Sequence, residues 1–467
     1  MNLSLFLVGA TIFRFVVGKY FPLIGDEAIY WLWSNHLDLS YVGHPPMIAY
    51  FIKGLTLIFG QTESAFRLGA ILLVTLVTIL VYNIGKELFG TKVGALSAII
   101  FNLLPLFLGG SIFLVPQQPF LLFWALSIYL FIQLVKTGRG TWWYALGVSA
   151  GLGLLSDYIM ILFFPAVGLY LILNKSLRFW WLKKEPYLAA IISFLLFSPV
   201  IIWNINLKFT SLSFWADRAA RTPPHPIQNI LSFLAMETAL YTPIILAIVL
   251  YLIFLLVRKV KTIDHNILLL SCLTSPVFLA FLALSPVLDV GGHWPAAAYI
   301  PAILFIAQAN RRWLIGTTLV FAVLINCLAF SYYLFLYPIP KELQGKEFTI
   351  NKQLPEFINA SNHKMRRIFF YANNLGLAGL VTFHGKAKVY MAAGREEQFD
   401  LWERPEVQKG DNIIYFALRE ESLYEKLIPL FKAVKIEPDK RLFTKDADIL
   451  NMTNIYYCYG YKGGILP

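Results

Sequence analysis

Long apolar runs separated by short polar segments fill residues 1–337. A helix needs about 20 mainly apolar residues to cross the hydrocarbon core of a membrane, so these runs predict membrane-spanning helices. We expect eleven spans, at residues 3–18, 65–85, 93–110, 118–135, 142–157, 158–174, 187–204, 230–257, 266–286, 295–309 and 313–337. The fifth and sixth spans share one apolar run, which only Ser156-Asp157-Tyr158 interrupts. The pattern predicts a polytopic α-helical membrane protein.

Composition agrees with this prediction. The 467 residues are 58% hydrophobic and 14% charged, whereas soluble domains are about 45–50% apolar and about 25% charged. The net charge of +12 comes from basic residues in short loops, where they act as topology signals, and nothing resembles a nucleic-acid-binding module. The scattered Cys272, Cys327 and Cys458 show neither a disulfide framework nor zinc-ligand spacing.

Basic residues in the short loops indicate the orientation of the chain. Cytoplasmic loops carry an excess of Lys and Arg, and with a cytoplasmic N-terminus every basic cluster falls on that side. The clusters are Lys86 and Lys92; Lys136 and Arg139; Lys175, Arg178, Lys183 and Lys184; Arg258, Lys259 and Lys261; and Arg311 and Arg312. Merging the fifth and sixth spans would break this agreement. Loops 19–64, 205–229 and 287–294 and the C-terminal segment then lie on the external, periplasmic side of the inner (plasma) membrane.

Two further segments differ from the spanning runs. Met47–Phe59 is apolar but too short to span, and we expect a helix lying along the membrane surface. The composition changes at Pro338-Ile339-Pro340, after which short β-like runs alternate with helical patterns. The β-like runs are Arg367–Tyr371, Ala387–Met391, Asn412–Leu418 and Val434–Ile436, and the helical patterns include Asn374–Phe383 and Glu420–Phe431. We therefore expect a transmembrane domain at residues 1–337 and a small external α/β domain at residues 338–467.

An acidic pair, Asp26 and Glu27, follows the first apolar run of this charge-poor chain. An ionisable residue within or beside a membrane helix is a functional hypothesis by default. The pair opens a loop rich in aromatic residues, from Tyr30 to Trp33, which continues to His44 before two prolines. These carboxylates are the first candidates for chemistry.

The external face limits the donor that such a site can use. ATP and, usually, nucleotide sugars are absent there, so a transferase needs a donor delivered through the membrane, and polyprenyl-phosphate sugars fit. A phosphate leaving group requires cations, and an acceptor hydroxyl requires a base. Both are present in the external segments, with Asp26 and Glu27 as acids and Arg67, Lys208, Arg218 and Arg221 as cations.

A series of motifs resembles the bacterial dolichyl-phosphate-mannose–protein-mannosyltransferase-like glycosyltransferases, which have the GT-C fold and include the lipid A aminoarabinose transferase. The motifs are Gly25-Asp26-Glu27-Ala28 with Tyr30-Trp31 and Trp33-Ser34; His44-Pro45-Pro46-Met47; Phe59-Gly60 with Glu63 and Arg67-Leu68; Phe197-Ser198-Pro199 with Trp203-Asn204; Ser213-Phe214 with Arg218; Gly292-His293-Trp294-Pro295-Ala296; and Gln398-Phe399-Asp400 with Trp402 and Gly410. Each motif is weak alone, but their order and spacing are fairly specific and cover nearly the whole chain.

The resemblance implies an integral membrane glycosyltransferase that moves a sugar from a polyprenyl-phosphate donor to an envelope acceptor such as lipid A, a glycan or a protein. It also implies that Asp26 is the catalytic base, with Glu27 beside it, and that Arg67 and Arg218 bind the donor phosphate. Further candidate substrate-binding residues are His44, Lys208, Asp157, Tyr158, Asn204 and His293. Membrane lipids are expected partners and nucleic acid is not. No cofactor is implied with certainty, although a divalent metal is allowed for.

Two positions depart from the family pattern. The family often has Pro-Asp-x-Pro where this chain has Pro116-Gln117-Gln118-Pro119, and Ser-Lys-Tyr where it has Ser156-Asp157-Tyr158. An acid is lost at Gln117 and a base is replaced by an acid at Asp157. Both changes alter local charge, which favours a divergent subfamily over a standard protein mannosyltransferase.

Other interpretations stay open at this point. Eleven spans allow a transporter or flippase of a lipid-linked substrate, but such folds carry internal repeats, and this sequence shows none. The two departures also allow an enzyme that hydrolyses the donor or has lost transferase activity. Several candidates could instead have structural roles. His44 could keep the segment before the two prolines extended, Asp157 could cap the next helix, and Glu27 could pair with a cation and orient its loop. Contacts with the membrane interface or lipid headgroups could explain Arg67, Arg218 and Arg221, and Trp294.

Overall fold

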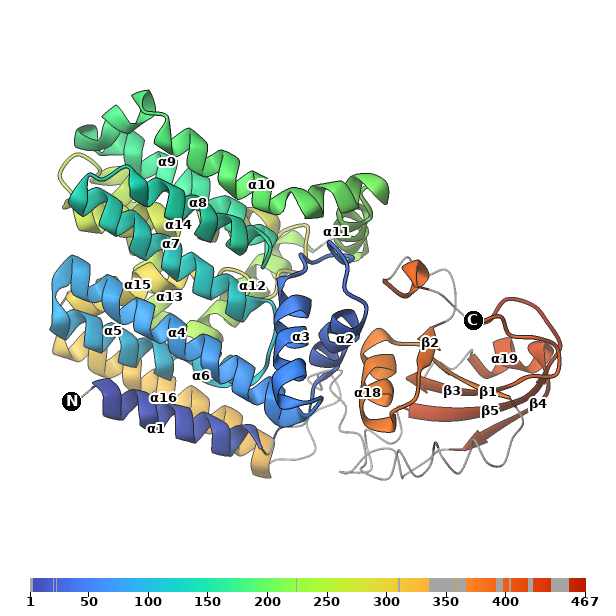
Figure 1. Ribbon diagram of the computed structural model, residues 1–467. Helices are drawn as coiled ribbons and strands as arrows, with labels where there is room; N and C mark the ends of the chain where they lie inside the picture. The colour runs from blue at the N-terminus through green and yellow to red at the C-terminus, as the bar shows by residue number, and fades with distance from the viewer. Residues whose placement is uncertain are drawn as a thin grey trace. The chain divides into compact units, whose positions relative to one another are not determined.

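The computed structural model describes residues 3–335 apart from 20, 22, 224 and 310, together with residues 358, 367–391, 398–402, 405–418, 423–437 and 453–467 (Figure 1). The chain forms two compact units. The first consists of Met1–Tyr20 and Asp38–Tyr333, and the second consists of Phe21–Leu37 and Leu334–Pro467. The expected boundary near residue 337 lies outside the described residues. The assignment of Phe21–Leu37 to the second unit is a feature that the sequence did not indicate.

The first unit is helical throughout. Its α-helices are α1 (Leu3–Gly18), α3 (Met47–Phe59), α4 (Glu63–Phe89), α5 (Thr91–Leu103), α6 (Pro105–Gly109), α7 (Gln117–Thr137), α8 (Thr141–Leu154), α9 (Phe163–Leu173), α10 (Glu185–Asn206), α11 (Thr210–Arg221), α12 (Pro226–Tyr241), α13 (Pro243–Arg258), α14 (His265–Leu284), α15 (Ala296–Gln308) and α16 (Arg312–Phe335). Three 3₁₀ helices, η1 (Gly110–Ile112), η2 (Tyr158–Leu162) and η3 (Lys175–Leu182), complete it. The helix expected at Met47–Phe59 has the predicted bounds.

The expected spans are helical, but their number is not confirmed. Within the described residues, five helices are long and apolar enough to cross a membrane, and eight spans result if each of three bent helix pairs counts as one. The segment expected to span at 230–257 is bent, because α12 and α13 meet at an angle of 114°. Pro243 has no N–H to continue the helical ladder, and Thr242 adopts a φ of +71°. The polytopic helical fold holds, while the count of eleven stays a prediction.

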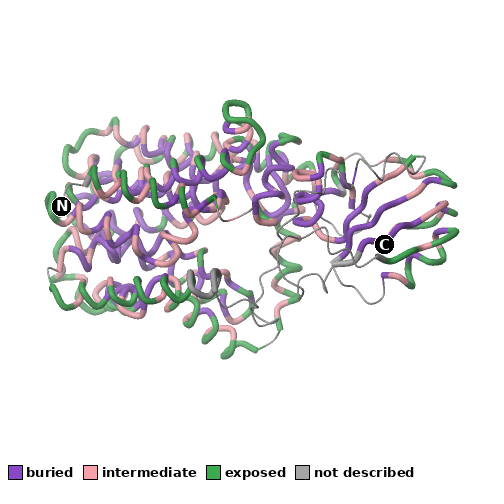
Figure 2. The backbone as a smooth tube through the Cα atoms, turned by 90° about the horizontal axis from the view of Figure 1, so that it is seen from below, coloured by how far each residue is buried: buried purple, intermediate pink, exposed green. Residues whose placement is uncertain are grey.

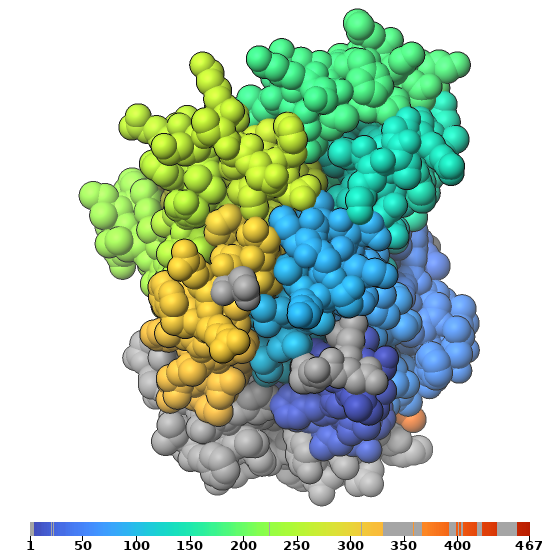
Figure 3. All heavy atoms as spheres, turned by 90° about the vertical axis from the view of Figure 1, so that its left-hand side faces the viewer, coloured from blue at the N-terminus to red at the C-terminus, as the bar shows by residue number. Residues whose placement is uncertain are grey.

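Small residues allow the helices of the first unit to pack closely. A Cβ atom at Gly94 of α5 would lie 2.4 Å from the carbonyl oxygen of Tyr82 in α4, and one at Gly147 of α8 would lie 2.6 Å from the carbonyl oxygen of Ala189 in α10. In the space-filling view the blue α4–α5 region adjoins the orange-yellow α15–α16 region (Figure 3). Such close approach suits a bundle whose helices associate by van der Waals packing.

The second unit contains a five-stranded sheet with the order β2-β1-β3-β5-β4. Its strands are β1 (Ile368–Ala372), β2 (Val389–Met391), β3 (Asn412–Leu418), β4 (Phe431–Glu437) and β5 (Thr453–Tyr461). β1 is parallel to β2 and β3, while β5 runs antiparallel between β3 and β4. The four expected β-like runs correspond to β1–β4, but β5 was not predicted. Figure 2 shows largely buried residues along the strands that form this core.

Helices accompany the sheet of the second unit. They are α2 (Gly25–Asn35), α18 (Leu375–Gly385), α19 (Leu423–Leu427), η4 (Gln398–Leu401) and η5 (Ile428–Leu430). The helix expected at Asn374–Phe383 is confirmed as α18, whereas the one expected at Glu420–Phe431 is shortened to α19, because β4 begins at Phe431. α2 packs on α18 with almost no side chain between them, since a Cβ atom at Gly379 would lie 2.8 Å from the carbonyl carbon of Ala28. This contact holds the helix that carries Asp26 and Glu27 against the C-terminal domain.

The glycine contacts give a direct test of the packing. We expect Gly94→Ala to lower the melting temperature by a few degrees, because overpacking a tight contact costs about 1–3 kcal/mol. Gly316→Ala is the matched control, since a Cβ atom there meets nothing within 4 Å and alanine stabilises a helix over glycine by about 0.5–1 kcal/mol. Tryptophan fluorescence during heating of the detergent-solubilised protein measures both. Equal effects of the two substitutions would contradict the α4–α5 contact.

Candidate functional site

The acidic pair opens α2, and its two members have different surroundings. Glu27 is fully buried, and one of its carboxylate oxygens accepts a hydrogen bond of 3.2 Å from the backbone N–H of Ile24. Glu27 therefore provides a hydrogen-bond partner for a backbone N–H at the start of the helix that has no acceptor within the helix. Asp26 is exposed in the same first turn, where the helix dipole stabilises a negative charge. Within this unit Asp26 presents its carboxylate at the surface while Glu27 secures the helix.

A short loop in the first unit carries His44. Tyr41 and His44 exchange backbone hydrogen bonds of 3.1 and 3.2 Å, and Gly43 between them has a φ of +81°. Such a φ at the third position of a turn favours glycine. The side chains of three residues from α10 and α11 hold this loop, with Trp203 Nε1 donating to Asp38 at 2.9 Å, Ser211 Oγ to the Tyr41 carbonyl at 3.3 Å, and Trp215 Nε1 to the Gly43 carbonyl at 3.2 Å. The position of His44 thus depends on the start of α11.

Arg218, in the last turn of α11, lies against two tryptophans. Its guanidinium carbon is 5.6 Å from the ring centroid of Trp215 and 5.4 Å from that of Trp294. The two rings are themselves 5.3 Å apart and nearly perpendicular, at 88°. Cation–π attraction of this kind is strongest with Trp and holds the guanidinium in place. Arg218 nevertheless stays exposed, so its N–H groups are presented for a planar or tetrahedral anion.

Two histidines flank this arginine. Burial, followed by the nearby charges of His293 and Arg218, lowers the pKa of His44 to about 4. Burial of its ring, followed by the Arg218 charge, also lowers the pKa of His293 below its usual range. Gln117, one of the two departures from the family pattern, donates from Nε2 to the His293 carbonyl at 3.3 Å. The structure therefore brings together His44, Arg218 and His293, and at neutral pH the positive charge of this cluster belongs to Arg218.

Tyr158 and Asn204 belong to a second polar cluster in the same unit. The Tyr158 hydroxyl is buried near Ser40, Asn204 and Ser211, but it forms no hydrogen bond within the described part of the chain. Asp157 lies beside it and caps η2, because its Oδ1 accepts from the Ile159 N–H at 3.0 Å. The helix cap considered from the sequence is therefore present at Asp157, while its role in substrate binding stays a prediction.

Arg67 and Lys208 lie outside both clusters. Arg67 is buried, donates to the Ile112 carbonyl at 2.9 Å and stacks over the Phe113 ring at 5.3 Å. Lys208 is exposed in the turn between α10 and α11, with a φ of +52°. Among the described residues, the Lys208 side chain forms no hydrogen bond, ion pair or cation–π contact. The phosphate-binding roles expected of Arg67 and Lys208 stay predictions.

Glu237 of α12 is a buried residue that the sequence reading did not single out. It accepts a hydrogen bond of 2.5 Å from the Tyr299 hydroxyl, and the Tyr299 ring stacks on Tyr241 at 3.5 Å. Tyr241 in turn donates to the Gly292 carbonyl at 3.2 Å, directly before His293. A lone acid in the apolar run 230–257 was the signal available in the sequence. This network supports the turn that presents His293 and Trp294.

Metal ligation was also considered. Across the residues that the structure describes, no group of three or more His, Cys, Asp or Glu side chains could hold a metal ion. The divalent metal allowed for by the sequence stays an expectation.

Known proteins similar to this chain were found by sequence and by structure. The family model for dolichyl-phosphate-mannose-protein mannosyltransferase matches residues 43–203. A lipid A galacturonosyltransferase from Rhizobium johnstonii is 23% identical over 335 residues, covering 70% of this chain and 68% of the relative. An undecaprenyl phosphate-alpha-4-amino-4-deoxy-L-arabinose arabinosyl transferase from Erwinia tasmaniensis is 27% identical over 192 residues, which are 40% of this chain and 34% of that enzyme.

Solved structures show the fold. ArnT from Cupriavidus metallidurans, in a crystal structure bound to undecaprenyl phosphate, aligns over 97% of both chains with a TM-score of 0.68 and 12% identity. The oligosaccharyltransferase of Archaeoglobus fulgidus aligns over 85% of this chain and 63% of its own, with a TM-score of 0.52 and 12% identity. The resemblance stated from the motifs is confirmed: the chain has the GT-C glycosyltransferase fold and is similar to the dolichyl-phosphate-mannose–protein mannosyltransferases and to the bacterial aminoarabinose transferase.

Proposed function

We propose that this protein transfers a sugar from a polyprenyl-phosphate donor to a lipid A, glycan or protein acceptor on the external face of the inner membrane. The observation that carries the proposal is the exposed guanidinium of Arg218, held between Trp215 and Trp294. Two relatives support the substrates, because ArnT was crystallised with undecaprenyl phosphate and the galacturonosyltransferase is named for lipid A. Lipid A is the acceptor we favour.

On the donor side, Arg218 binds the phosphate that links sugar and polyprenol. Since the neighbouring histidines are neutral near pH 7, Arg218 provides the charge that compensates the phosphate. Negative charge on the phosphate grows as the bond to the sugar breaks, so a fixed cation there stabilises the transition state more than the ground state. The tryptophans reduce the motion of the guanidinium before the donor arrives.

On the acceptor side, Asp26 is the proposed general base. Its carboxylate takes the proton of the acceptor hydroxyl while that oxygen attacks the anomeric carbon. The bond between the anomeric carbon and the phosphate oxygen breaks, and polyprenyl phosphate leaves. Glu27 acts indirectly, because its carboxylate accepts from the Ile24 N–H and fixes the first turn of α2.

The membrane arrangement forms part of the same proposal. In this proposal the N-terminus lies in the cytoplasm, and the C-terminal domain and the loops bearing Asp26, His44 and Arg218 lie in the periplasm. The Lys and Arg residues of the short loops support this orientation. Nucleotide sugars are usually absent from the external side, so an active site there requires a donor sugar that is linked to a lipid.

Asp26→Asn tests the base. We expect transfer of labelled sugar to lipid A to fall by about 10²- to 10⁴-fold, because an amide cannot accept the proton. Glu425→Gln, on an exposed face of the short α19, is the matched control and should transfer at the rate of the unchanged protein. Mass spectrometry of the acceptor measures both variants after their melting temperatures have been compared. Undiminished transfer by a folded Asp26→Asn protein would remove the proposed mechanism.

Arg218→Ala tests the phosphate site. Donor affinity should fall about 10- to 100-fold, since a hydrogen bond to a charged group contributes about 1.5–3 kcal/mol. Arg221→Ala removes the same charge one turn later on the same exposed helix and should change affinity little. The donor affinity of Arg218→Lys should lie between those of Arg218→Ala and Arg221→Ala, because lysine keeps the positive charge but lacks the planar guanidinium. Binding of a polyprenyl-phosphate sugar, followed by tryptophan fluorescence, provides the comparison, and equal losses for Arg218→Ala and Arg221→Ala would favour a diffuse surface charge.

The neutral histidines predict the pH dependence of donor binding. A phosphodiester donor keeps one charge over this range, and a histidine whose folded-state pKa is about 4 gains no proton until the pH falls well below 6. Donor affinity should therefore stay nearly constant between about pH 6 and pH 8. A titration by isothermal calorimetry across this range measures it. Affinity that rises several-fold as the pH falls towards 6 would show that a protonated histidine shares the phosphate charge.

A further inference from the structure

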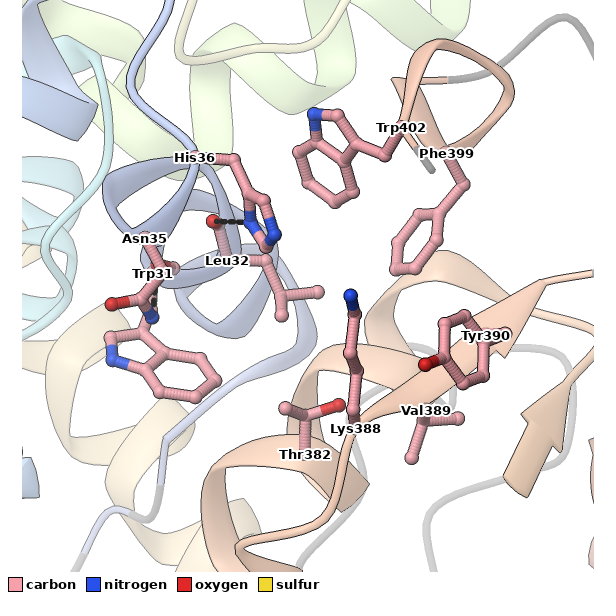
Figure 4. Close-up of a pocket in the computed structure, with 10 residues that line it drawn as sticks. All are labelled: Trp31, Leu32, Asn35, His36, Thr382, Lys388, Val389, Tyr390, Phe399 and Trp402. Carbon is pink, nitrogen blue, oxygen red and sulfur yellow. Dashed lines mark hydrogen bonds between the residues drawn. The ribbon is translucent and has the colours of Figure 1, made fainter. Parts of the chain in front are cut away.

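The second unit contains a cavity of about 280 Å³ at the C-terminal end of α2. Its ten lining residues are Trp31, Leu32, Asn35, His36, Thr382, Lys388, Val389, Tyr390, Phe399 and Trp402 (Figure 4). Ligand pockets usually have volumes of about 300–1,000 Å³, so a cavity at the lower end of this range suits one small ring rather than a whole lipid.

Aromatic side chains form the walls of this cavity. The His36 and Trp402 rings stack with centroids 4.3 Å apart, and Phe399 packs on Trp402 at 4.8 Å. Trp31 is held from behind by an edge-on contact with Phe383 at 5.0 Å. These contacts join α2 to the segment around η4, so the walls are fixed by packing within the unit. Flat, supported aromatic faces suit a ring with an apolar face and polar edges.

One ammonium group is directed into the cavity. Figure 4 shows Lys388, from the start of β2, with its Nζ pointing into the space bordered by His36, Phe399 and Tyr390. The Lys388 Nζ is 5.3 Å from the centroid of the Tyr390 ring, so the aromatic face helps to hold the ammonium group in this position. None of the ten lining residues carries a carboxylate, and Lys388 forms no ion pair with a described residue. An anion entering the cavity would therefore meet an uncompensated positive charge.

We propose that this cavity binds an anionic sugar unit of the acceptor, with the ring against Trp402 and the phosphate or carboxylate on Lys388. This proposal rests on the proposed transferase function. The residues that line the cavity from α2 and its C-cap follow Asp26 by five to ten positions, which is roughly 7–15 Å along a helix. The cavity therefore binds a part of the acceptor remote from the hydroxyl that receives the sugar. The cavity selects acceptors that carry a charged sugar at that separation.

Binding to the full-length protein in detergent tests the proposal without requiring turnover. Glucose 1-phosphate and glucuronic acid are the anionic probes, and methyl glucoside and inorganic phosphate supply the ring and the anion alone. Saturation-transfer NMR should show that either or both anionic sugars bind at least tenfold more tightly than methyl glucoside and inorganic phosphate. Preference for one of the two identifies the anion as phosphate or carboxylate. Equal binding of inorganic phosphate, or no binding of either anionic sugar, would overturn the proposal.

Variants locate the binding. Lys388→Met should weaken the preferred anionic sugar about tenfold or more, and Trp402→Ala should do the same, while Trp402→Phe keeps a ring and should retain most of the affinity. Lys435→Met removes an exposed lysine from β4 and is the matched control. In transfer assays with lipid A, Lys388→Met should raise KM and leave kcat within about twofold. Unchanged affinity and unchanged KM in Lys388→Met would contradict the proposal.

The experiments distinguish a failure of the cavity proposal from a failure of the proposed transferase function. Asp26→Asn should bind the anionic sugar like the unchanged protein although its transfer of sugar is strongly reduced. If Asp26→Asn transfers normally, the transferase mechanism fails while the binding measurement still reports on the cavity. If Asp26→Asn is inactive but Lys388→Met changes neither binding nor KM, only the cavity proposal fails.

Discussion

The contact between the Arg218 guanidinium and the rings of Trp215 and Trp294 is the interaction on which the proposed donor site depends. It joins α11 to the turn before α15, and it places a permanent positive charge at the surface with little freedom to move. The same α11 holds the His44 loop through Ser211 and Trp215. Loss of Trp215 would therefore disturb both the cation and the loop, whereas loss of Trp294 would remove one of the two rings that contact the guanidinium.

Electrostatics around this arginine follow from its position. Both neighbouring histidines are neutral, first because burial lowers the pKa of each ring and second because the Arg218 charge disfavours another cation beside it. Gln117, where the family often has a carboxylate, contributes a neutral amide that donates to the His293 carbonyl. Behind the turn, the buried Glu237 and the stacked tyrosines set the position of His293 and Trp294.

Much of the fold could be predicted from the sequence, because apolar runs and the requirement for internal hydrogen bonding in lipid leave few alternatives to helices. The bounds of α3 and most of the strands followed from local patterns. The bend at Thr242 did not, since an apolar run conceals the effect of Pro243 on the helix. β5 was missed although it is rich in tyrosine, and its pairing with β3 joins segments about 40 residues apart. The number of spans remains open because several apolar segments are short or bent.

The candidate site was predictable in part. The order of the motifs identified His44, Arg218 and His293 as candidates, and in the structure they lie close together beside Trp215 and Trp294. The difference between Asp26 and Glu27 could not be predicted, because both are carboxylates in one turn and only the fold decides which is buried. Likewise, the stacking of His36 on Trp402 joins residues that are far apart in the sequence, so local sequence patterns could not predict it.

The most direct test of the proposed sugar transfer is a reaction in which both products, the modified acceptor and the released polyprenyl phosphate, are measured. Purified protein is incubated with lipid A and a polyprenyl-phosphate sugar that carries an isotopic label in the sugar, and all products are followed by mass spectrometry. The account predicts labelled lipid A and unlabelled polyprenyl phosphate in equal amounts. Release of free labelled sugar irrespective of acceptor would instead show a hydrolase, and an intact donor in the presence of lipid A, glycan and protein acceptors would contradict sugar transfer.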